Sequence, residues 1–344
     1  MTRLFCTDLG ILHKRMVYHI MKKRLHLTCS SMVRHVCLVF LFMLVNGTVH
    51  GQEKFIFTPQ WTAQAQFAGY YVAQEKGFYK EAGLNVEIVH PSLTQPAMKR
   101  IQNQESHATT LQLNQAMEIV DSGIELVNIL QTSMNNALTI VSRRGVNPLT
   151  QKGARVGIWT SGTSDLALCV NMKEQLDYEW VPFASNVNLY VAGAVDATVA
   201  MSYNEYYQLL QTGLPLDETC VYRLSEHGYN FQEDGVYMTR EYYDAHREQA
   251  KKFAQASRRG WEWAASHPDE TLAIVMKYVQ ENHIITNRTL QKLMLEEILR
   301  LQVDRDSGKR EFRLRPDMVK KLSQLLMECR MLKHEVTYEQ LIAK

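Results

Sequence analysis

After an N-terminal segment, the sequence alternates short strand patterns with helical ones, and this alternation limits the fold more than any other feature. Residues 53–59 and 85–91 alternate with the period of two that strands show, whereas residues 65–76 place apolar side chains at helical spacing. Further helix patterns follow at 95–105 and 114–123. Because only a few residues join these elements, the alternation predicts an α/β sheet rather than a β-sandwich or a helical bundle.

The alternation is interrupted once, by a loop rich in Gly, Pro and polar residues at 143–154, and restarts at residue 155. Residues 236–243 have the pattern of a strand that returns to the first sheet, and the sequence is helical from Arg247 onward. The pattern predicts two α/β lobes, the second inserted in the first, with a helical C-terminal layer. The predicted parts are an upstream extension and signal peptide (1–51), the first part of lobe 1 (52–145), lobe 2 (146–234) and the lobe 1 return with the C-terminal helices (235–344).

The formal net charge of +2 combines two unlike parts. Residues 1–51 carry seven Lys and Arg residues and one Asp, which leaves 31 basic and 35 acidic residues in the rest of the chain. A body with a net charge near −4 and no clustered basic face is not expected to bind nucleic acid.

An export signal is predicted near the N-terminus. A basic stretch that begins at Met21 precedes an apolar run of ten residues at 36–45. Such a run is too short to cross a hydrocarbon core of about 30 Å but suits a signal peptide. Val49 and Gly51 stand at the −3 and −1 positions of a cleavage site before Gln52. We therefore expect a periplasmic or extracytoplasmic protein; the alternative is that the apolar run is retained as a membrane anchor.

The sequence contains none of the common catalytic motifs GxSxG, HExxH, Walker A or GxGxxG. Outside the N-terminal segment, Cys169, Cys220 and Cys329 are scattered and odd in number, which fits neither a disulfide framework nor a metal site. We expect them to be small buried hydrophobic residues. No catalytic residue and no metal ligand is predicted.

Three segments that follow predicted strands are candidates for a ligand site. In the first, Trp61 comes just after the strand at 53–59, and Tyr70 lies on the helix behind it. An aromatic ring at the carboxyl end of a strand can stack on a flat ligand. The alternative is that Trp61 only covers the edge of the sheet.

The second candidate is the small-residue turn at 161–164, ahead of a helix that begins at Asp165. Gly162 and Thr163 could expose backbone N–H groups at the start of this helix to an anion or to a polar ligand edge. Capping of the helix by Thr163 or Ser164 explains the same residues without a ligand.

The third candidate is Tyr203, Asn204 and Glu205, which follow the predicted strand at 196–201. A carboxylate at this place can accept two hydrogen bonds from an edge of the aminopyrimidine type, and its charge strengthens both. Alternatively, Glu205 only interacts with the dipole of the helix that it begins.

The segments QFAGYYVAQEKGFYKEAGLNVEI, GTSD and SYNEYYQL, in this order and spacing, resemble the thiamine-pyrimidine family of periplasmic-type binding proteins. The resemblance covers residues 53–280, and the family is close to the sulfonate- and nitrate-binding proteins of ABC importers. It implies a type II periplasmic binding fold whose two lobes close on a nitrogen heterocycle such as a formylated aminopyrimidine. It also implies a monomer that passes this ligand to a membrane permease driven by a separate ATPase, without a cofactor.

The resemblance assigns roles to the candidate residues. Trp61 would stack on the ring and Glu205 would bind its amino edge. The remaining wall would come from Tyr203 with the neighbouring Asn204, from Asn188, and from the Gly162–Thr163 turn, with Tyr70 as a further aromatic candidate.

The family also includes thiamine pyrimidine synthases, which use pyridoxal phosphate, iron and one of their own histidines. Leu111 and Gln115 stand where these enzymes carry a lysine and that histidine, and residues 226–238 contain no cysteine where the enzymes have a cysteine-rich cluster. Because leucine cannot form a Schiff base and glutamine has no imidazole, binding is predicted rather than synthesis. The alternatives kept open are the synthase itself and a ligand-sensing partner of a membrane receptor.

Overall fold

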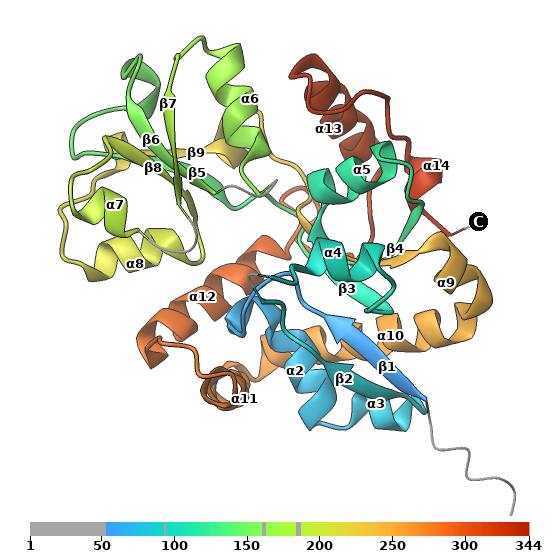
Figure 1. Cartoon of the computed structure of the whole chain (residues 1–344). Helices are drawn as coiled ribbons and strands as arrows, with labels where there is room; N and C mark the ends of the chain where they lie inside the picture. Colours follow the sequence, from blue (N-terminus) through green and yellow to red (C-terminus); the bar gives the residue numbers. More distant parts are fainter. Residues whose placement is uncertain (1–52, 93, 160–162, 184–186, 344) are drawn as a thin grey trace, which may run out of the picture. The chain divides into compact units, whose positions relative to one another are not determined.

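The computed structural model of the protein describes residues 53–92, 94–159, 163–183 and 187–343. The predicted signal segment lies outside these residues. The strands form two five-stranded sheets, of order β2-β1-β3-β10-β4 and β7-β6-β8-β5-β9, which Figure 1 shows as separate groups of arrows. The strands are β1 (Lys54–Thr58), β2 (Asn85–Ile88), β3 (Ala108–Gln112), β4 (Leu126–Gln131), β5 (Leu138–Ser142), β6 (Arg155–Trp159), β7 (Glu179–Phe183), β8 (Ala197–Met201), β9 (Val221–Arg223) and β10 (Asp234–Thr239).

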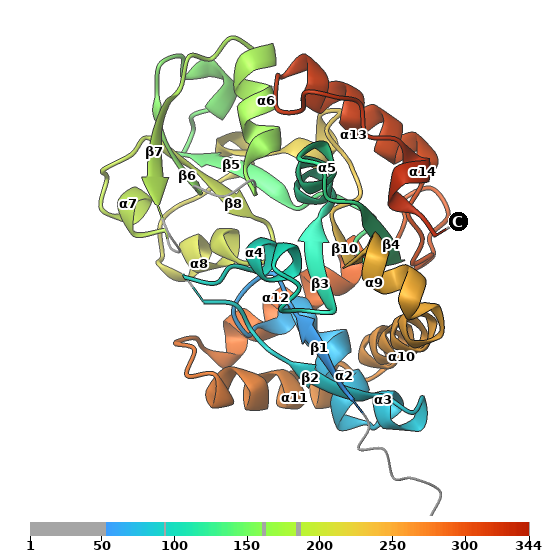
Figure 2. The ribbon, with the colours of Figure 1, turned by 45° about the vertical axis from the view of Figure 1, so that its right-hand side comes forward.

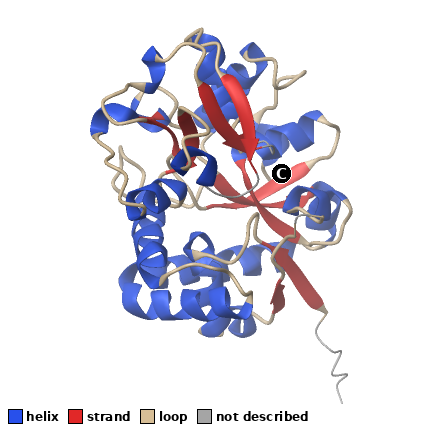
Figure 3. Cartoon of the chain, turned by 60° about the vertical axis from the view of Figure 1, so that its left-hand side comes forward, coloured by secondary structure: helices blue, strands red, loops and turns tan. Residues whose placement is uncertain are grey.

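Helices enclose the strands of both sheets (Figure 3). They are α2 (Ala68–Glu75), α3 (Phe78–Glu81), α4 (Ala97–Gln102), α5 (Leu113–Asp121), α6 (Asp165–Lys173), α7 (Asn188–Val191), α8 (Glu205–Gln211), α9 (Arg240–Ala245), α10 (Arg247–Ser266), α11 (Pro268–Glu281), α12 (Arg288–Leu301), α13 (Pro316–Glu328) and α14 (Tyr338–Leu341). The helical character predicted from Arg247 onward is confirmed, and Pro268 and Pro316 each stand at the first position of a helix, which proline tolerates best. None of the helices in the described part is long and apolar enough to cross a membrane.

The two sheets follow one pattern. In each sheet three neighbouring strands are parallel (β2, β1 and β3; β7, β6 and β8), and the fourth strand in the order is antiparallel to both of its neighbours. That fourth strand is β10 in the first sheet and β5 in the second. The chain therefore crosses between the sheets twice, after β4 and before β10. The return of residues 236–243 to the first sheet is confirmed by the position of β10.

One strand differs from the predicted domain boundary. The boundary after residue 145 assigns residues 138–142 to the first lobe, but β5 pairs with β8 and β9 in the second sheet. Because β5 lies between β8 and β9, the chain has already passed from the first sheet to the second before residue 138. Residues 54–344 form a single compact unit, so the other predicted domain bounds remain predictions.

The two crossing segments are hydrogen-bonded to each other. Backbone N–H groups of Thr132 and Ser133 donate to the carbonyl oxygen of Asp234, at 2.9 and 3.0 Å. The carboxyl group of Glu233 accepts from Asn136 Nδ2 (3.3 Å) and from the backbone N–H of Ala137 (3.2 Å). Because these groups are buried, each unpaired partner would carry a large desolvation penalty, so the bonds hold the crossings together.

Helices α12 and α13 also join elements of the two sheets. Ser202 directly follows β8 of the second sheet, and its hydroxyl donates to Glu297 of α12 at 2.7 Å. Cys169 of α6 contacts Met331, which follows α13, with the two sulfur atoms 3.7 Å apart. Figure 2 shows α13 beside α5 and α6.

Cys169, Cys220 and Cys329 are free and buried, so the prediction of buried unpaired cysteines is confirmed.

The closest helix packing lies under the first sheet, where α2 crosses α10. Gly69 of α2 lies against the ring of Trp261, and Gly260 of α10 lies against the backbone of α2. A Cβ atom on Gly260 would overlap the carbonyl oxygen of Gly69. Trp261 is 1% exposed and meets Tyr70 edge-on, with ring centroids 5.6 Å apart. Glycine is needed at this crossing because only a missing side chain allows the two backbones to approach so closely.

We expect Gly260→Ala to lower the free energy of unfolding by about 3 kcal/mol, since the overlapping group is backbone and cannot rotate away. Gly213→Ala is the matched control: its Cβ would meet open space, and its φ of 76° alone predicts a loss of about 1 kcal/mol. Urea unfolding followed by circular dichroism measures both. Equal losses for the two variants would show that the crossing has room to relax.

Candidate functional site

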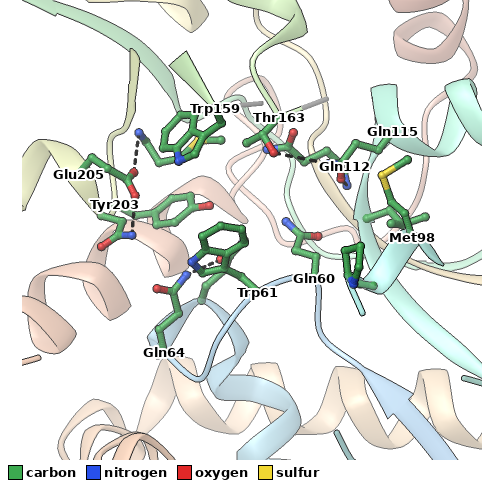
Figure 4. Close-up of a pocket in the computed structure, with 16 residues that line it drawn as sticks. Gln60, Trp61, Gln64, Met98, Gln112, Gln115, Trp159, Thr163, Tyr203 and Glu205 are labelled. Atoms are coloured by element: carbon green, nitrogen blue, oxygen red, sulfur yellow. Dashed lines mark hydrogen bonds between the residues drawn. The ribbon is translucent and has the colours of Figure 1, made fainter. Parts of the chain in front are cut away.

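A pocket lies at the carboxyl ends of parallel strands from both sheets, as expected for an α/β fold. It holds about 690 Å³ of space, part of it open to solvent. The first-sheet side contributes Gln60, Trp61, Gln64, Gln66, Pro96, Ala97, Met98, Leu111, Gln112 and Gln115. The second-sheet side contributes Trp159, Thr163, Met201, Tyr203, Asn204 and Glu205. Figure 4 shows the labelled members of both groups around a common space.

Three aromatic residues form much of the wall. Trp159 ends β6 and Tyr203 follows β8, and both are buried; Trp61 follows β1 and is partly buried. The carbonyl group of Trp61 accepts a hydrogen bond from His90 Nδ1 at 2.7 Å, and His90 Nε2 lies 2.9 Å from the hydroxyl of Tyr71. Burial lowers the pKa of His90 to about 4, so its ring is neutral at neutral pH, with Nδ1–H donating and Nε2 accepting from Tyr71. This chain of bonds holds the backbone that carries Trp61.

Glu205 is the acidic side chain of the wall. It is the first residue of α8 and is 4% exposed. Its carboxyl group accepts from the backbone N–H of Met201 at 3.1 Å and from Asn204 Nδ2 at 2.8 Å. Burial raises the pKa of Glu205 to about 7, although these donors pull it down. The group is therefore poised to change its protonation near neutral pH, and it can accept a hydrogen bond from a ligand or share a proton with it.

Asn204 and Tyr203 surround this carboxyl group. Asn204 Oδ1 accepts from Gln208 Nε2 at 2.8 Å, which fixes the amide so that its nitrogen faces Glu205. Burial raises the pKa of Tyr203 well above its usual value of 10, and the nearby carboxyl groups of Asp234, Glu233 and Glu205 raise it further. The Tyr203 hydroxyl thus stays protonated and is able to donate.

Glutamines supply the polar part of the first-sheet wall, and sequence reasoning missed them. Gln64 and Gln66 are buried, and Gln60 is partly buried. Behind the wall, Asp234 accepts from Gln60 Nε2 at 2.9 Å and from Gln66 Nε2 at 2.7 Å, and Gln66 Oε1 accepts from Gln64 Nε2 at 2.7 Å. Burial raises the pKa of Asp234, while the two amide donors lower it. The signal that could have found them is the spacing of three glutamines around Trp61 just after a strand.

The charge of the wall is one-sided. Among the described residues that line the pocket there is no Lys, Arg or His, and Glu205 is the one ionisable acid. A bound anion needs compensating positive charge or many N–H donors when it leaves water. The described wall is better suited to a neutral or cationic ligand that donates hydrogen bonds.

The turn before α6 contributes one described residue to the wall. Thr163 lines the pocket, and its hydroxyl accepts from Gln115 Nε2 at 3.5 Å. Ser164 stands at the N-cap position of α6, but its side chain makes no hydrogen bond to the helix. Side-chain capping therefore does not explain why a serine stands at this position. Gly162 lies outside the described residues, so its predicted role stays a prediction.

Two predicted ligand residues lie away from the pocket. Tyr70 is 1% exposed in the hydrophobic core, packed between Phe57 and Trp261, because α2 turns this face toward α10. The expectation that it joins the wall is corrected accordingly. Asn188 begins α7 and is not among the described residues that line the pocket. Trp61, Thr163, Tyr203, Asn204 and Glu205 are brought together, and their ligand roles remain predictions.

Leu111 and Gln115 also line the pocket, at the end of β3 and in the first turn of α5. These are the positions where the resemblance places the lysine and histidine of the synthases. The side chain of Gln115 accepts from the backbone N–H of Gln112 at 3.2 Å and so takes part in starting α5.

Two comparisons with known proteins match more than half of the chain. A family model described as NMT1/THI5 like matches residues 64–271. A formylaminopyrimidine-binding protein of Halalkalibacterium halodurans is 24% identical over 229 residues, which are 63% of this chain and 68% of that protein.

Solved structures share the fold at low identity. The periplasmic aliphatic sulphonate binding protein SsuA of Escherichia coli is 13% identical, covers 85% of this chain and 92% of its own, and gives a TM-score of 0.61. The ligand-binding component of an ABC-type import system from Staphylococcus aureus, solved with zinc bound, is 10% identical, with 85% and 97% covered and a TM-score of 0.61. The predicted fold class, a two-lobed periplasmic binding protein fold of α/β type, is confirmed by these likenesses.

The raised pKa of Glu205 predicts a pH-dependent stability. In the folded protein this pKa is about 7, against an ordinary value of 4.5, so the native state holds a proton that the unfolded chain has already lost between these values. The free energy of unfolding should therefore fall as pH rises through this window. Between pH 5 and pH 8 the wild type should lose about 2–3 kcal/mol more than Glu205→Gln. Urea unfolding of both proteins at several pH values measures the difference, and parallel profiles would show that Glu205 titrates normally.

Proposed function

Because the chain belongs to the NMT1/THI5-like family, we propose that it is the extracytoplasmic solute-binding protein of an ABC importer and binds an aminopyrimidine. Its ligand would be a thiamine precursor of the formylaminopyrimidine type, passed as a small heterocycle to a membrane permease driven by a separate ATPase. The protein would act as a monomer and without a cofactor.

The observation that carries the proposal is the buried carboxyl group of Glu205 in a pocket with aromatic walls and no basic side chain among its described residues. The rings of Trp61 and Trp159 offer apolar faces to a flat ligand, and Glu205 offers an acceptor to its amino edge. An aminopyrimidine has both features, whereas a sulfonate or nitrate would meet a carboxyl group where it needs donors.

The relatives support the same ligand class. The formylaminopyrimidine-binding relative shares 24% identity with this chain. The sulphonate-binding protein shares the fold at 13% identity, and the fold by itself accommodates many ligands. The choice between these classes therefore rests on the side chains of the wall.

Binding would couple to closure of the two walls. The first-sheet wall carries Trp61 and the second-sheet wall carries Glu205, so a ligand that contacts both favours the closed arrangement. Gln115 and Thr163 already meet across the pocket at 3.5 Å, a distance that closure could shorten.

The synthase alternative requires chemistry that the described wall does not supply. A Schiff base with pyridoxal phosphate needs a primary amine, and the wall has Leu111 at the lysine position. Gln115 stands at the position of the histidine that would be consumed. The wall also offers no basic side chain to a phosphate among its described residues.

We expect isothermal calorimetry to detect binding of formylaminopyrimidine or hydroxymethylpyrimidine to the mature chain. Glu205→Gln should weaken this binding by about 1.5–3 kcal/mol, because a hydrogen bond to a charged acceptor is lost. Nitrate and an alkanesulfonate are the comparison ligands. Tight binding of either anion, with none of the pyrimidines, would contradict the proposal.

Trp61→Leu should weaken pyrimidine binding by about 1–2 kcal/mol, since leucine keeps apolar contact but removes the stacking face. Trp180→Leu is the control, because Trp180 is a partly buried tryptophan that packs on Tyr178 outside the pocket lining. Equal effects of the two substitutions would show that Trp61 acts through stability alone.

A further inference from the structure

A buried carboxyl group behind the pocket orients three side-chain amides in its wall. Each oxygen of Asp234 accepts from one glutamine, Oδ1 from Gln60 at 2.9 Å and Oδ2 from Gln66 at 2.7 Å. Asp234 is 9% exposed and does not line the pocket, whereas both glutamines do.

A carboxylate accepts hydrogen bonds and cannot donate them, so it fixes the direction of each amide that contacts it. Gln60 and Gln66 must turn their NH₂ groups toward Asp234 and their oxygens away from it. The oxygen of Gln66 is then available as an acceptor, and Gln64 donates to it at 2.7 Å. The direction is thereby passed on to Gln64, whose own oxygen must point away from Gln66.

This orientation leaves one buried oxygen of the wall without a hydrogen-bond donor in the described part of the chain. Gln60 Oε1 is buried and has no hydrogen-bond partner among the described residues. In Figure 4 the amide of Gln60 points into the pocket, on the side of the chamber away from Glu205. An acceptor buried in this way is unfavourable unless a ligand or a water supplies a donor.

We propose that Asp234 is a positioning residue for ligand selectivity: through the Gln60 and Gln66–Gln64 amides it makes the first-sheet wall an acceptor surface opposite Glu205. The pocket then selects a flat heterocycle with hydrogen-bond donors on two separate edges. The amino edge would meet Glu205, and a second O–H or N–H would meet Gln60. This inference rests on the proposed function and names the feature of the pyrimidine that the wall selects.

The test compares hydroxymethylpyrimidine with its methyl ether, which keeps the amino edge but has no donor on the second edge. Calorimetry of the wild type should show the alcohol binding roughly 10- to 100-fold more tightly, the effect of an unpaired buried acceptor. In Asp234→Asn one amide must turn its oxygen toward the new NH₂ group and present a donor to the pocket. The ratio of the two dissociation constants should then fall to within about threefold.

Glu233→Gln is the matched control. Glu233 is the neighbouring buried carboxyl group, and the described part of the chain shows its side chain accepting from Asn136 and Ala137 rather than from a glutamine of the wall. This substitution also replaces a buried carboxyl group by an amide but leaves Asp234 in place, so the ratio of the two affinities should stay at the wild-type value. A ratio that survives both Asp234→Asn and Gln60→Met, or that collapses equally in Glu233→Gln, would overturn the inference.

Two further measurements keep the test decisive if Asp234→Asn does not fold or if the wild type binds neither probe. If Asp234→Asn does not fold, Gln60→Met removes the unpartnered acceptor without altering the carboxyl group and should lower the ratio in the same way. If the wild type binds neither probe, the proposed function is wrong, and the amide network is judged by NMR of the free protein. The side-chain NH₂ protons of Gln60 and Gln66 should be protected from exchange in the wild type and in Glu233→Gln, and one of these two NH₂ groups should lose its protection in Asp234→Asn. Unchanged protection would overturn the network.

Discussion

Two adjacent buried carboxyl groups stand where the chain returns from the second sheet to the first, and both the fold and the pocket depend on their hydrogen bonds. Glu233 holds the outgoing crossing through Asn136 and Ala137. Asp234 accepts backbone N–H groups of that crossing through its carbonyl oxygen, and holds the glutamine wall through its side chain. Buried acids are tolerated only where donors replace the lost water. The segment that leads into β10 thus holds the two sheets together and also positions the glutamines that line the pocket.

The same balance explains the chemistry of the wall. Glu205 is buried among the Met201 N–H group and the Asn204 amide, and its pKa of about 7 reflects desolvation that these two donors only partly offset. With Gln60 on the other wall, a buried acceptor stands on each side of the pocket. The fold is shared with a sulphonate-binding protein at 13% identity, and the side chains at the strand ends can change while the sheets persist.

Much of this could be predicted from local patterns. Strand and helix periods, proline positions and the return of the chain near residue 236 depend on neighbouring residues, and they were predicted correctly. Trp61 and Glu205 were found because an aromatic ring and a carboxylate stood directly after strands. Tyr70 was misjudged because a tyrosine on a helix can face either the core or a pocket, and the choice depends on the position of α10. The glutamines were overlooked because a polar side chain after a strand is usually solvated.

The sequence by itself determined the order and type of the elements, the family, and which strand ends carry aromatic and acidic side chains, because each of these follows from periodicity or from a contiguous motif. The tertiary structure decided that β5 belongs to the second sheet and that Asp234 faces Gln60 and Gln66. Gln66 and Asp234 are 168 positions apart, and nothing in either segment specifies the other. The direction of a side-chain amide is set only by the partner that folding places beside it, and that partner determines which groups the wall presents to a ligand.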